Sequence, residues 1–166
     1  MRVWLWALLI AVADQASKHW VRDVFALGES RPIIASVFHF TYLRNTGAAW
    51  SMLGGQNLWL AALSVVVLAV MVIFRRAFLS DGWEHRLALG LLAGGILGNV
   101  CDRIKLGYVT DFLDFFWHGH HFPVFNVADS AICVGVFLYV LSSLWVAGHP
   151  LNDQALKTSS HGGNAT

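Results

Sequence analysis

The chain has 166 residues, of which 57% are hydrophobic and 13% are charged, and its formal net charge is +1. Its mean hydropathy is +0.58. This apolar, charge-poor composition excludes an ordinary soluble domain and indicates a membrane protein. The near-neutral balance gives no reason to expect a nucleic-acid partner.

The first apolar stretch, residues 3–21, allows two interpretations. It contains Ala11-Val12-Ala13, which has the A-x-A form of a signal-peptide cleavage site, so it can be a leader. It then continues through Asp14 and Lys18, whose spacing puts both on one helix face. Ionisable groups inside a membrane span are costly and are functional candidates, so it can equally be a retained transmembrane helix.

Three further apolar stretches follow. Residues 57–74 and 130–148 are of spanning length, whereas 87–101 is short and is expected to extend at both ends. Glycines at successive i+4 positions in the third stretch predict close helix packing; they are Gly90, Gly94 and Gly98. The sequence predicts an all-α membrane protein with one domain, residues 1–149, and four transmembrane helices. These spans cover about residues 3–21, 57–74, 86–104 and 129–148.

Two long connections separate the spans. Within residues 33–43, alternating β-branched and aromatic residues predict a strand or hairpin near the membrane surface. Residues 104–128 are aromatic and interrupted by Gly and Pro, and are interpreted as a connection. Residues 75–86 are short and charged, with a turn at Asp81-Gly82. The polar tail, residues 150–166, is expected to be disordered.

Four spans place the two long connections on one side of the membrane and both termini on the other. The polar residues of the spans then gather on the side of the long connections; they are Asp14, Lys18, Arg44, Asn45, Asn99, Asp102, Arg103, Asp111, Asn126 and Asp129. Lys and Arg are almost equally divided between the two sides, so the positive-inside rule does not assign the orientation.

Paired aspartates are the best candidates for chemistry. Two Asp held close together share a proton, so one can act as base toward a water and the other as acid toward a carbonyl oxygen. Asp129 opens a helix, so capping explains it as well as catalysis does. Asp111 has less reason to be a cap, and Asp102-Arg103 is interpreted as an ion pair or a snorkelling pair at a helix end.

The histidines of the second connection do not form a recognisable metal motif. His118, His120 and His121 lie in an aromatic loop, lack a helical zinc-binding sequence and would leave the ligand set incomplete. We expect no metal and no cofactor, and assign these histidines no role.

Five sequence blocks in order are specific enough to suggest a family. They are DQASK (14–18), RNTGAAWS (44–51), GGILGNVCDRI (94–104), VTDFLDF (109–115) and FNVADSAI (125–132). On these blocks the chain resembles the lipoprotein signal peptidases (type II), bacterial membrane aspartic proteases with four spans, over residues 10–145. Trp50 stands where the family usually has Phe, and Cys101 lies between the Asn and Asp-Arg of its block.

The resemblance implies roles for individual residues. The catalytic aspartates would be Asp111 and Asp129. The substrate-binding or supporting residues would be Asp14, Lys18, Asn45, Asn99, Arg103 and Asn126. The reaction implied is hydrolysis of prolipoproteins immediately before the diacylglyceryl-modified cysteine.

The resemblance also implies a location and partners. The enzyme would lie in the bacterial cytoplasmic (inner) membrane, with both termini in the cytoplasm. The site and a small extracytoplasmic β-sheet would lie on the outer side. Lipid-modified prolipoproteins, membrane lipid and cyclic peptide inhibitors of the globomycin type are the expected partners, and we expect a monomer. DQASK is then part of a retained first span, not the end of a leader.

Two other classes of protein fit part of the pattern. A proton-coupled carrier also uses Asp and Lys inside the membrane, but the two halves of this chain show no internal repeat. A structural scaffold built on the glycine face leaves the carboxylates without a role.

Overall fold

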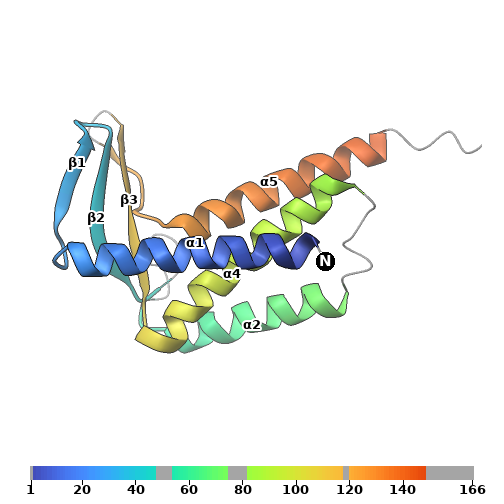
Figure 1. The fold of residues 1–166 in the computed structure, drawn as a ribbon, viewed down its shortest axis with the longest axis horizontal. Helices are drawn as coiled ribbons and strands as arrows, with labels where there is room; N and C mark the ends of the chain where they lie inside the picture. Colours follow the sequence, from blue (N-terminus) through green and yellow to red (C-terminus); the bar gives the residue numbers. More distant parts are fainter. Residues whose placement is uncertain (1, 48–53, 75–81, 118–119, 149–166) are drawn as a thin grey trace, which may run out of the picture.

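Four helices and a small antiparallel sheet make up the computed structural model, which describes residues 2–47, 54–74, 82–117 and 120–148. The helices run roughly along one direction and the sheet lies across one end of them (Figure 1). The helices are α1 (Arg2–Val24), α2 (Asn57–Ile73), α4 (Trp83–Leu106) and α5 (Val127–Gly148). The tail 150–166, for which disorder is predicted, lies outside the described residues.

The four helices coincide with the four apolar stretches of the sequence. The third extends at both ends, as expected, and together with α5 it is long and apolar enough to cross a membrane. The helix α2 is more apolar than either but has only 17 residues. With 23 residues, α1 extends over about 34 Å, close to the thickness of a bilayer's hydrocarbon core.

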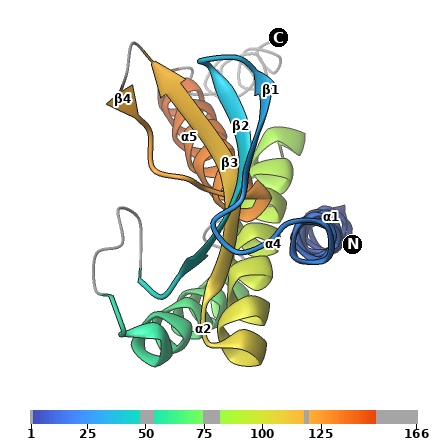
Figure 2. The ribbon, with the colours of Figure 1, turned by 90° about the vertical axis from the view of Figure 1, so that its left-hand side faces the viewer.

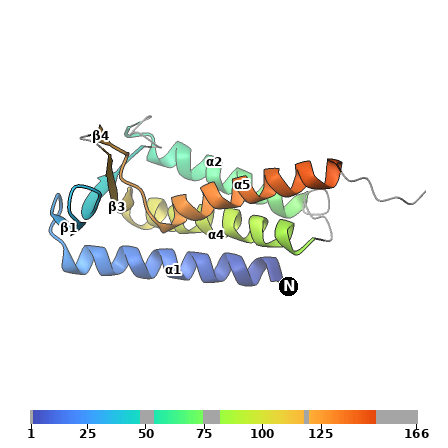
Figure 3. The same ribbon diagram turned by 90° about the horizontal axis from the view of Figure 1, so that it is seen from above.

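The helix α4 is the centre of the bundle, since it packs against α1, α2 and α5. Its glycines allow a close approach to α1, as the i+4 spacing predicts. A Cβ added at Gly94 would lie 2.6 Å from the carbonyl oxygen of Ala7, and one at Gly98 would meet the carboxylate of Asp14. Figure 3 shows α4 beside both α1 and α5 along most of its length.

The sheet contains β1 (Ser30–Ile34), β2 (Phe38–Asn45), β3 (Val109–Trp117) and the two-residue β4 (His120–His121), in the order β1-β2-β3-β4 (Figure 2). All neighbours are antiparallel. The hairpin predicted from residues 33–43 is confirmed, although β1 begins three residues earlier. The strand β3 was not expected, because residues 104–128 were interpreted as a connection.

The alternation of β3 is broken, which explains why its sequence did not indicate a strand. The backbone N–H groups of Phe112 and Leu113 both donate to the carbonyl oxygen of Phe125, at 2.9 and 2.8 Å. Both side chains pack in or against one core cluster, together with Val21 and Tyr42. Such a bulge interrupts the two-residue period from which strands are recognised. The core cluster joins the end of α1 to the sheet.

Candidate active site

The residues that the sequence singled out lie together where the helices meet the sheet. Asp14 and Lys18 come from α1, Asn99 and Arg103 from α4, Asn45 from β2, Asp111 from β3, Asn126 from the residue before α5 and Asp129 from its first turn. Side-chain and backbone hydrogen bonds and one ion pair connect seven of these eight residues, and Arg103 interacts electrostatically with the two carboxylates.

Asp111 is one of the buried members of this cluster. It is 4% exposed, and each of its carboxylate oxygens accepts a hydrogen bond from a neutral amide. Asn45 Nδ2 donates to Oδ2 at 2.9 Å, and Asn126 Nδ2 donates to Oδ1 at 2.7 Å. These amides orient the carboxylate without neutralising it.

Asp129 has a capping role and a second contact that capping does not require. Its Oδ2 accepts the backbone N–H of Asn126 at 3.2 Å, while Asn126 Oδ1 accepts the backbone N–H of Asp129 at 3.0 Å. This reciprocal pair is a capping box with Asn126 as the N-cap. The other oxygen, Oδ1, accepts Asn99 Nδ2 at 2.8 Å. Capping therefore accounts for only one of the two carboxylate oxygens.

Asn126 bridges the two aspartates, since it donates to Asp111 with its side chain and to Asp129 with its backbone. Burial raises the pKa of Asp111 to about 7, and the negative charge of Asp129 acts in the same direction. The hydrogen bonds from Asn45 and Asn126 partly oppose this rise. Near neutral pH Asp111 is therefore partly protonated.

Lys18 is connected to Asp129 through Asn99. Its side chain is fully buried, and Nζ lies 2.8 Å from Asp14 Oδ2 and 2.8 Å from Asn99 Oδ1. Because Nζ donates to the amide oxygen of Asn99, the amide nitrogen points toward Asp129. The second oxygen of Asp14 accepts the backbone N–H of Ala128 at 2.9 Å. The predicted neutralising pair thus also connects α1 to α4 and α5.

Asp102 differs from its prediction. It lies 3.6 Å from Lys18 Nζ and 3.6 Å from Arg22 Nη1, and it also accepts the backbone N–H of Thr110 at 2.9 Å. Its interpretation as the partner of Arg103 was wrong, because neighbouring residues on a helix do not face each other. Gln15 joins the same network, donating to Asp102 at 3.1 Å and to the carbonyl oxygen of Gly98 at 3.0 Å.

Sequence reasoning gave no role to Gln15, Arg22 or Thr110. Gln15 is part of the DQASK block, so its position next to Asp14 could have indicated that it belongs to the site. Arg22 lies one helical turn beyond Lys18 on α1 and donates to Thr110 Oγ1 at 2.9 Å. Nothing in the sequence pairs that turn with β3.

Arg103 approaches the site from α4 with its guanidinium partly engaged. Nη2 donates to the carbonyl oxygen of Gly47 at 3.1 Å, and the positive charge faces both Asp111 and Asp129. The buried Nε has no hydrogen-bond partner within the described ranges. One guanidinium donor of Arg103 therefore remains without an acceptor in these ranges.

No group of three or more His, Cys, Asp or Glu side chains suited to a metal ion occurs in the part of the chain that the structure describes. His118 lies outside the described residues, as do the side chains of His120 and His121. The segment 48–53, which includes Trp50, also lies outside them.

Comparisons with known proteins agree on one family. The model of the signal peptidase (SPase) II family matches residues 6–145. A lipoprotein signal peptidase of Shewanella pealeana is 49% identical over 150 residues, which cover 87% of both chains. One from a Nostoc species is 44% identical over 142 residues, or 85% of this chain and 88% of that one.

Solved structures are similar over nearly the whole chain. One bacterial membrane enzyme superposes with a TM-score of 0.80 at 32% identity, over 89% of this chain and 90% of that one. A second has a TM-score of 0.74 at 34% identity, over 84% and 90% of the respective chains.

Proposed function

The chain belongs to the signal peptidase II family, and from this we propose that it is an aspartic endopeptidase that removes signal peptides from bacterial prolipoproteins. The bond cleaved is the one before the diacylglyceryl-modified cysteine. The observation that carries the mechanism is the bridging of Asp111 and Asp129 by Asn126. It puts a buried carboxyl group with a pKa near neutrality next to a second carboxylate.

The reaction uses one proton between the two aspartates. Asp129, as carboxylate, takes a proton from a water molecule while that water's oxygen attacks the scissile carbonyl carbon. Asp111, as carboxylic acid, gives its proton to the carbonyl oxygen, so a neutral tetrahedral diol forms. The diol returns a proton to Asp111 as the C–N bond breaks, and Asp129 gives its proton to the leaving nitrogen. One water is consumed and both groups recover their initial states.

Neutral amides and one guanidinium surround the reacting groups and suit an extended peptide. Asn45, Asn99 and Asn126 provide donors and acceptors without adding charge to the site. The free Nε–H of Arg103 is positioned to donate to a substrate carbonyl. Amino acids before and after the cysteine would then be held on either side of the dyad.

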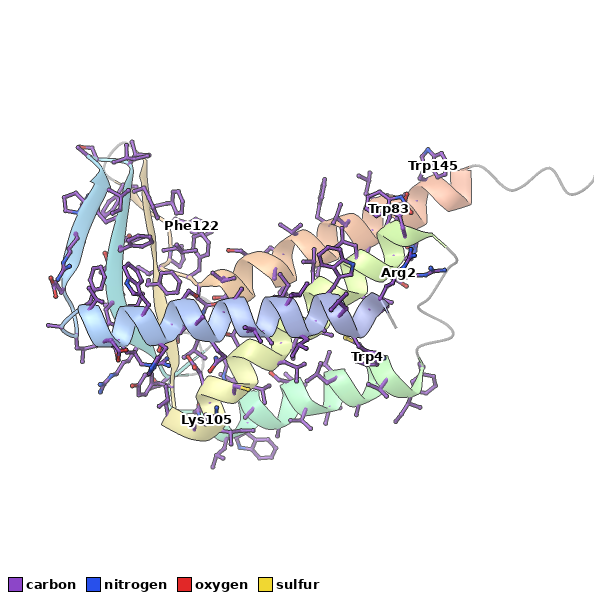
Figure 4. All side chains as sticks on the ribbon, viewed as in Figure 1. Arg2, Trp4, Trp83, Lys105, Phe122 and Trp145 are labelled. Carbon is purple, nitrogen blue, oxygen red and sulfur yellow. The ribbon has the colours of Figure 1, made fainter. Side chains whose placement is uncertain are left out.

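The position of the site matches a substrate that is held in the bilayer by acyl chains. The cluster lies where the helices meet the sheet, at the opposite end of the bundle from Arg2, Trp83 and Trp145 (Figure 4). We assign the sheet end to the outer side of the cytoplasmic membrane, with four spans and both termini in the cytoplasm. The enzyme acts as a monomer and is inhibited by cyclic peptides of the globomycin type.

A cleavage assay on a lipid-modified prolipoprotein in detergent tests the proposal. Asp111→Asn and Asp129→Asn should each lower turnover by at least a thousandfold, because neither amide can exchange the required proton. Asp23→Asn is the matched control, since this exposed carboxylate pairs with His19, at 3.5 Å, and with no other side chain of the described residues.

Two results would contradict the mechanism. Full activity in either dyad variant, with normal membrane insertion, would remove that aspartate from the chemistry. Strong inhibition by a chelator, reversed by added zinc, would indicate a metalloprotease instead.

A further inference from the structure

Two arginines and two tyrosines form a separate cluster on the sheet. Arg44 Nε donates to the hydroxyl of Tyr42 at 3.2 Å, and the Arg44 guanidinium lies 4.7 Å from the ring centroid of Tyr108. The Arg44 guanidinium also lies 6.0 Å from the ring centroid of Tyr42. Arg44 pairs in register with Thr110, which accepts a hydrogen bond from Arg22. We call Arg22, Tyr42, Arg44 and Tyr108 the arginine–tyrosine cluster.

This cluster faces away from the catalytic pair. Successive side chains of a strand point to opposite faces of its sheet. Asn45 donates to Asp111, so its neighbour Arg44 points to the other face. The side chains of Tyr42 and Arg44 contact each other because they share that face. The mechanism leaves Arg44 without a role.

Arg44 also differs from the other arginines at this end in its charge balance. Within the described ranges no carboxylate lies within 4.0 Å of its guanidinium, and the residue is exposed. Arg22 lies 3.6 Å from Asp102, and Arg31 lies 2.7 Å from Glu29. The positive charge of Arg44 is therefore surrounded by aromatic rings and hydroxyls rather than by an anion.

In the orientation proposed above, the cluster lies near the level where the helices leave the hydrocarbon core. Arg22 is in the last turn of α1, and Tyr108 lies two residues beyond the end of α4. Trp20, 46% exposed, and Ile104, 69% exposed, are the apolar residues of the adjoining turns. Figure 4 places Lys105 at this end of the bundle, opposite Arg2. Lipid phosphates occupy this level of a bilayer.

We propose that the arginine–tyrosine cluster binds the phosphate group of an anionic phospholipid in the leaflet at the sheet end. The planar donors of Arg44 match two phosphate oxygens, and the Tyr108 hydroxyl supplies another polar contact. The Arg22 guanidinium adds positive charge from the α1 side, and acyl chains lie against Ile104. The lipid thereby holds β2 at the membrane surface, on the face opposite to the dyad.

Lipid titration of the full-length protein in a neutral detergent tests this site. Phosphatidylglycerol should raise the Tm and remain bound in native mass spectrometry, whereas phosphatidylcholine should do so only weakly. Arg44→Gln should weaken the apparent affinity for phosphatidylglycerol about tenfold, the usual effect of losing a charge-assisted contact. Tyr108→Phe should have a smaller effect in the same direction.

Arg31→Gln is the matched control, because it removes a cation from the same end whose charge Glu29 already balances. It should leave the lipid affinity unchanged. The measured quantity is the rise in Tm caused by the lipid, so a variant with a lower Tm in the absence of lipid remains informative. Arg44→Lys keeps the positive charge and should keep part of this rise. Wild-type affinity in Arg44→Gln, or equal losses in Arg44→Gln and Arg31→Gln, would overturn the proposal. An equal rise with inorganic phosphate alone would overturn it as well, because it would assign the cluster to a free anion.

Discussion

At the scale of single residues, the amide side chains organise the site. Asn126 caps α5, bridges the two aspartates and satisfies one oxygen of each. Asn99 connects the buried Lys18 to Asp129. Its amide oxygen accepts a hydrogen bond from Lys18, and its amide nitrogen donates one to Asp129. Each of these amides is held by the surrounding structure and in turn orients a carboxylate.

The pKa of Asp111 predicts the alkaline side of the pH–activity profile. Because burial raises this pKa to about 7, the group loses its proton, and its function as acid, as the pH rises through that value. We expect kcat/KM to fall above pH 7 with one apparent pKa that belongs to the pair. Asn45→Ala removes a hydrogen bond that lowers this pKa, so the fall should move to higher pH.

Stability should change in the same pH range. A raised carboxyl pKa means that the folded protein binds more protons than the unfolded chain between about pH 4 and pH 7. The contribution of Asp111 to stability is therefore full below pH 4 and is lost as the pH rises to 7. Ser64→Ala, on α2, is the control for both measurements, because among the described residues this hydroxyl bonds only to Leu60 of its own helix. An unchanged profile in Asn45→Ala would contradict the assignment of Asp111 as the acid.

At the scale of elements, helix spacing determines where the polar groups meet. The absence of side chains at Gly94 and Gly98 lets α1 and α4 approach closely, and this approach brings Lys18 within reach of Asn99. On the other side of the site, the bulge at Phe112 and Leu113 changes which residues of β3 face the core. Asp111 and Asp114 are three residues apart, yet each accepts a hydrogen bond from β2, from Asn45 and Thr41 respectively.

Filling the glycine contact should separate the helices and reduce both stability and activity. A Cβ at Gly94 would lie 2.6 Å from the Ala7 carbonyl oxygen and 2.7 Å from Ile10 Cβ, and backbone cannot move aside cheaply. We expect Gly94→Ala to cost about 1–3 kcal/mol, the usual range for overpacking, and to lower kcat. Thermal unfolding in detergent and the cleavage assay measure the two effects.

Leu97→Ala is the matched control for this change, since Leu97 lies on the same helix and is 36% exposed. It should have a much smaller effect on kcat. If Gly94→Ala matched the wild type in both assays, close packing of α1 on α4 would not be what positions Lys18.

At the scale of the whole molecule, the chain order places all polar blocks at one end. The C-terminal ends of α1 and α4 and the N-terminal end of α5 lie there, and the sheet covers the same end (Figure 1). Residues more than a hundred positions apart, such as Asp14 and Ala128, therefore come into hydrogen-bond contact.

The proposed orientation predicts the reactivity of two positions on α1. After replacement of Cys101 and Cys133 by Ser, a membrane-impermeant thiol reagent added to intact cells with a permeable outer membrane should label Asp23→Cys. It should not label Arg2→Cys until the inner membrane is opened. Both positions are exposed, and they lie at opposite ends of one helix. Labelling of Arg2→Cys alone in intact cells would reverse the orientation.

Much of this protein was determined by its sequence alone. Four apolar stretches predicted the four helices, because burying or immersing so much apolar surface leaves few alternatives. The alternation in residues 33–43 predicted the hairpin, and the i+4 glycines predicted a close helix contact. The five blocks identified the family, since these residue types in this order are specific. They also contain the eight residues predicted for the site, although the network contacts of Gln15, Arg22 and Thr110 were not predicted.

Only the tertiary structure decided how those residues are connected. Asp102 pairs with Lys18 and Arg22 of another helix, and β3 is a bulged strand whose alternation is interrupted at Phe112 and Leu113. Hydrogen bonds between distant segments depend on helix separation and strand register, which local patterns do not encode. For the same reason, only the tertiary structure distinguished the two faces of β2. Asn45 is on the face toward the dyad, and the exposed Arg44 is on the other face.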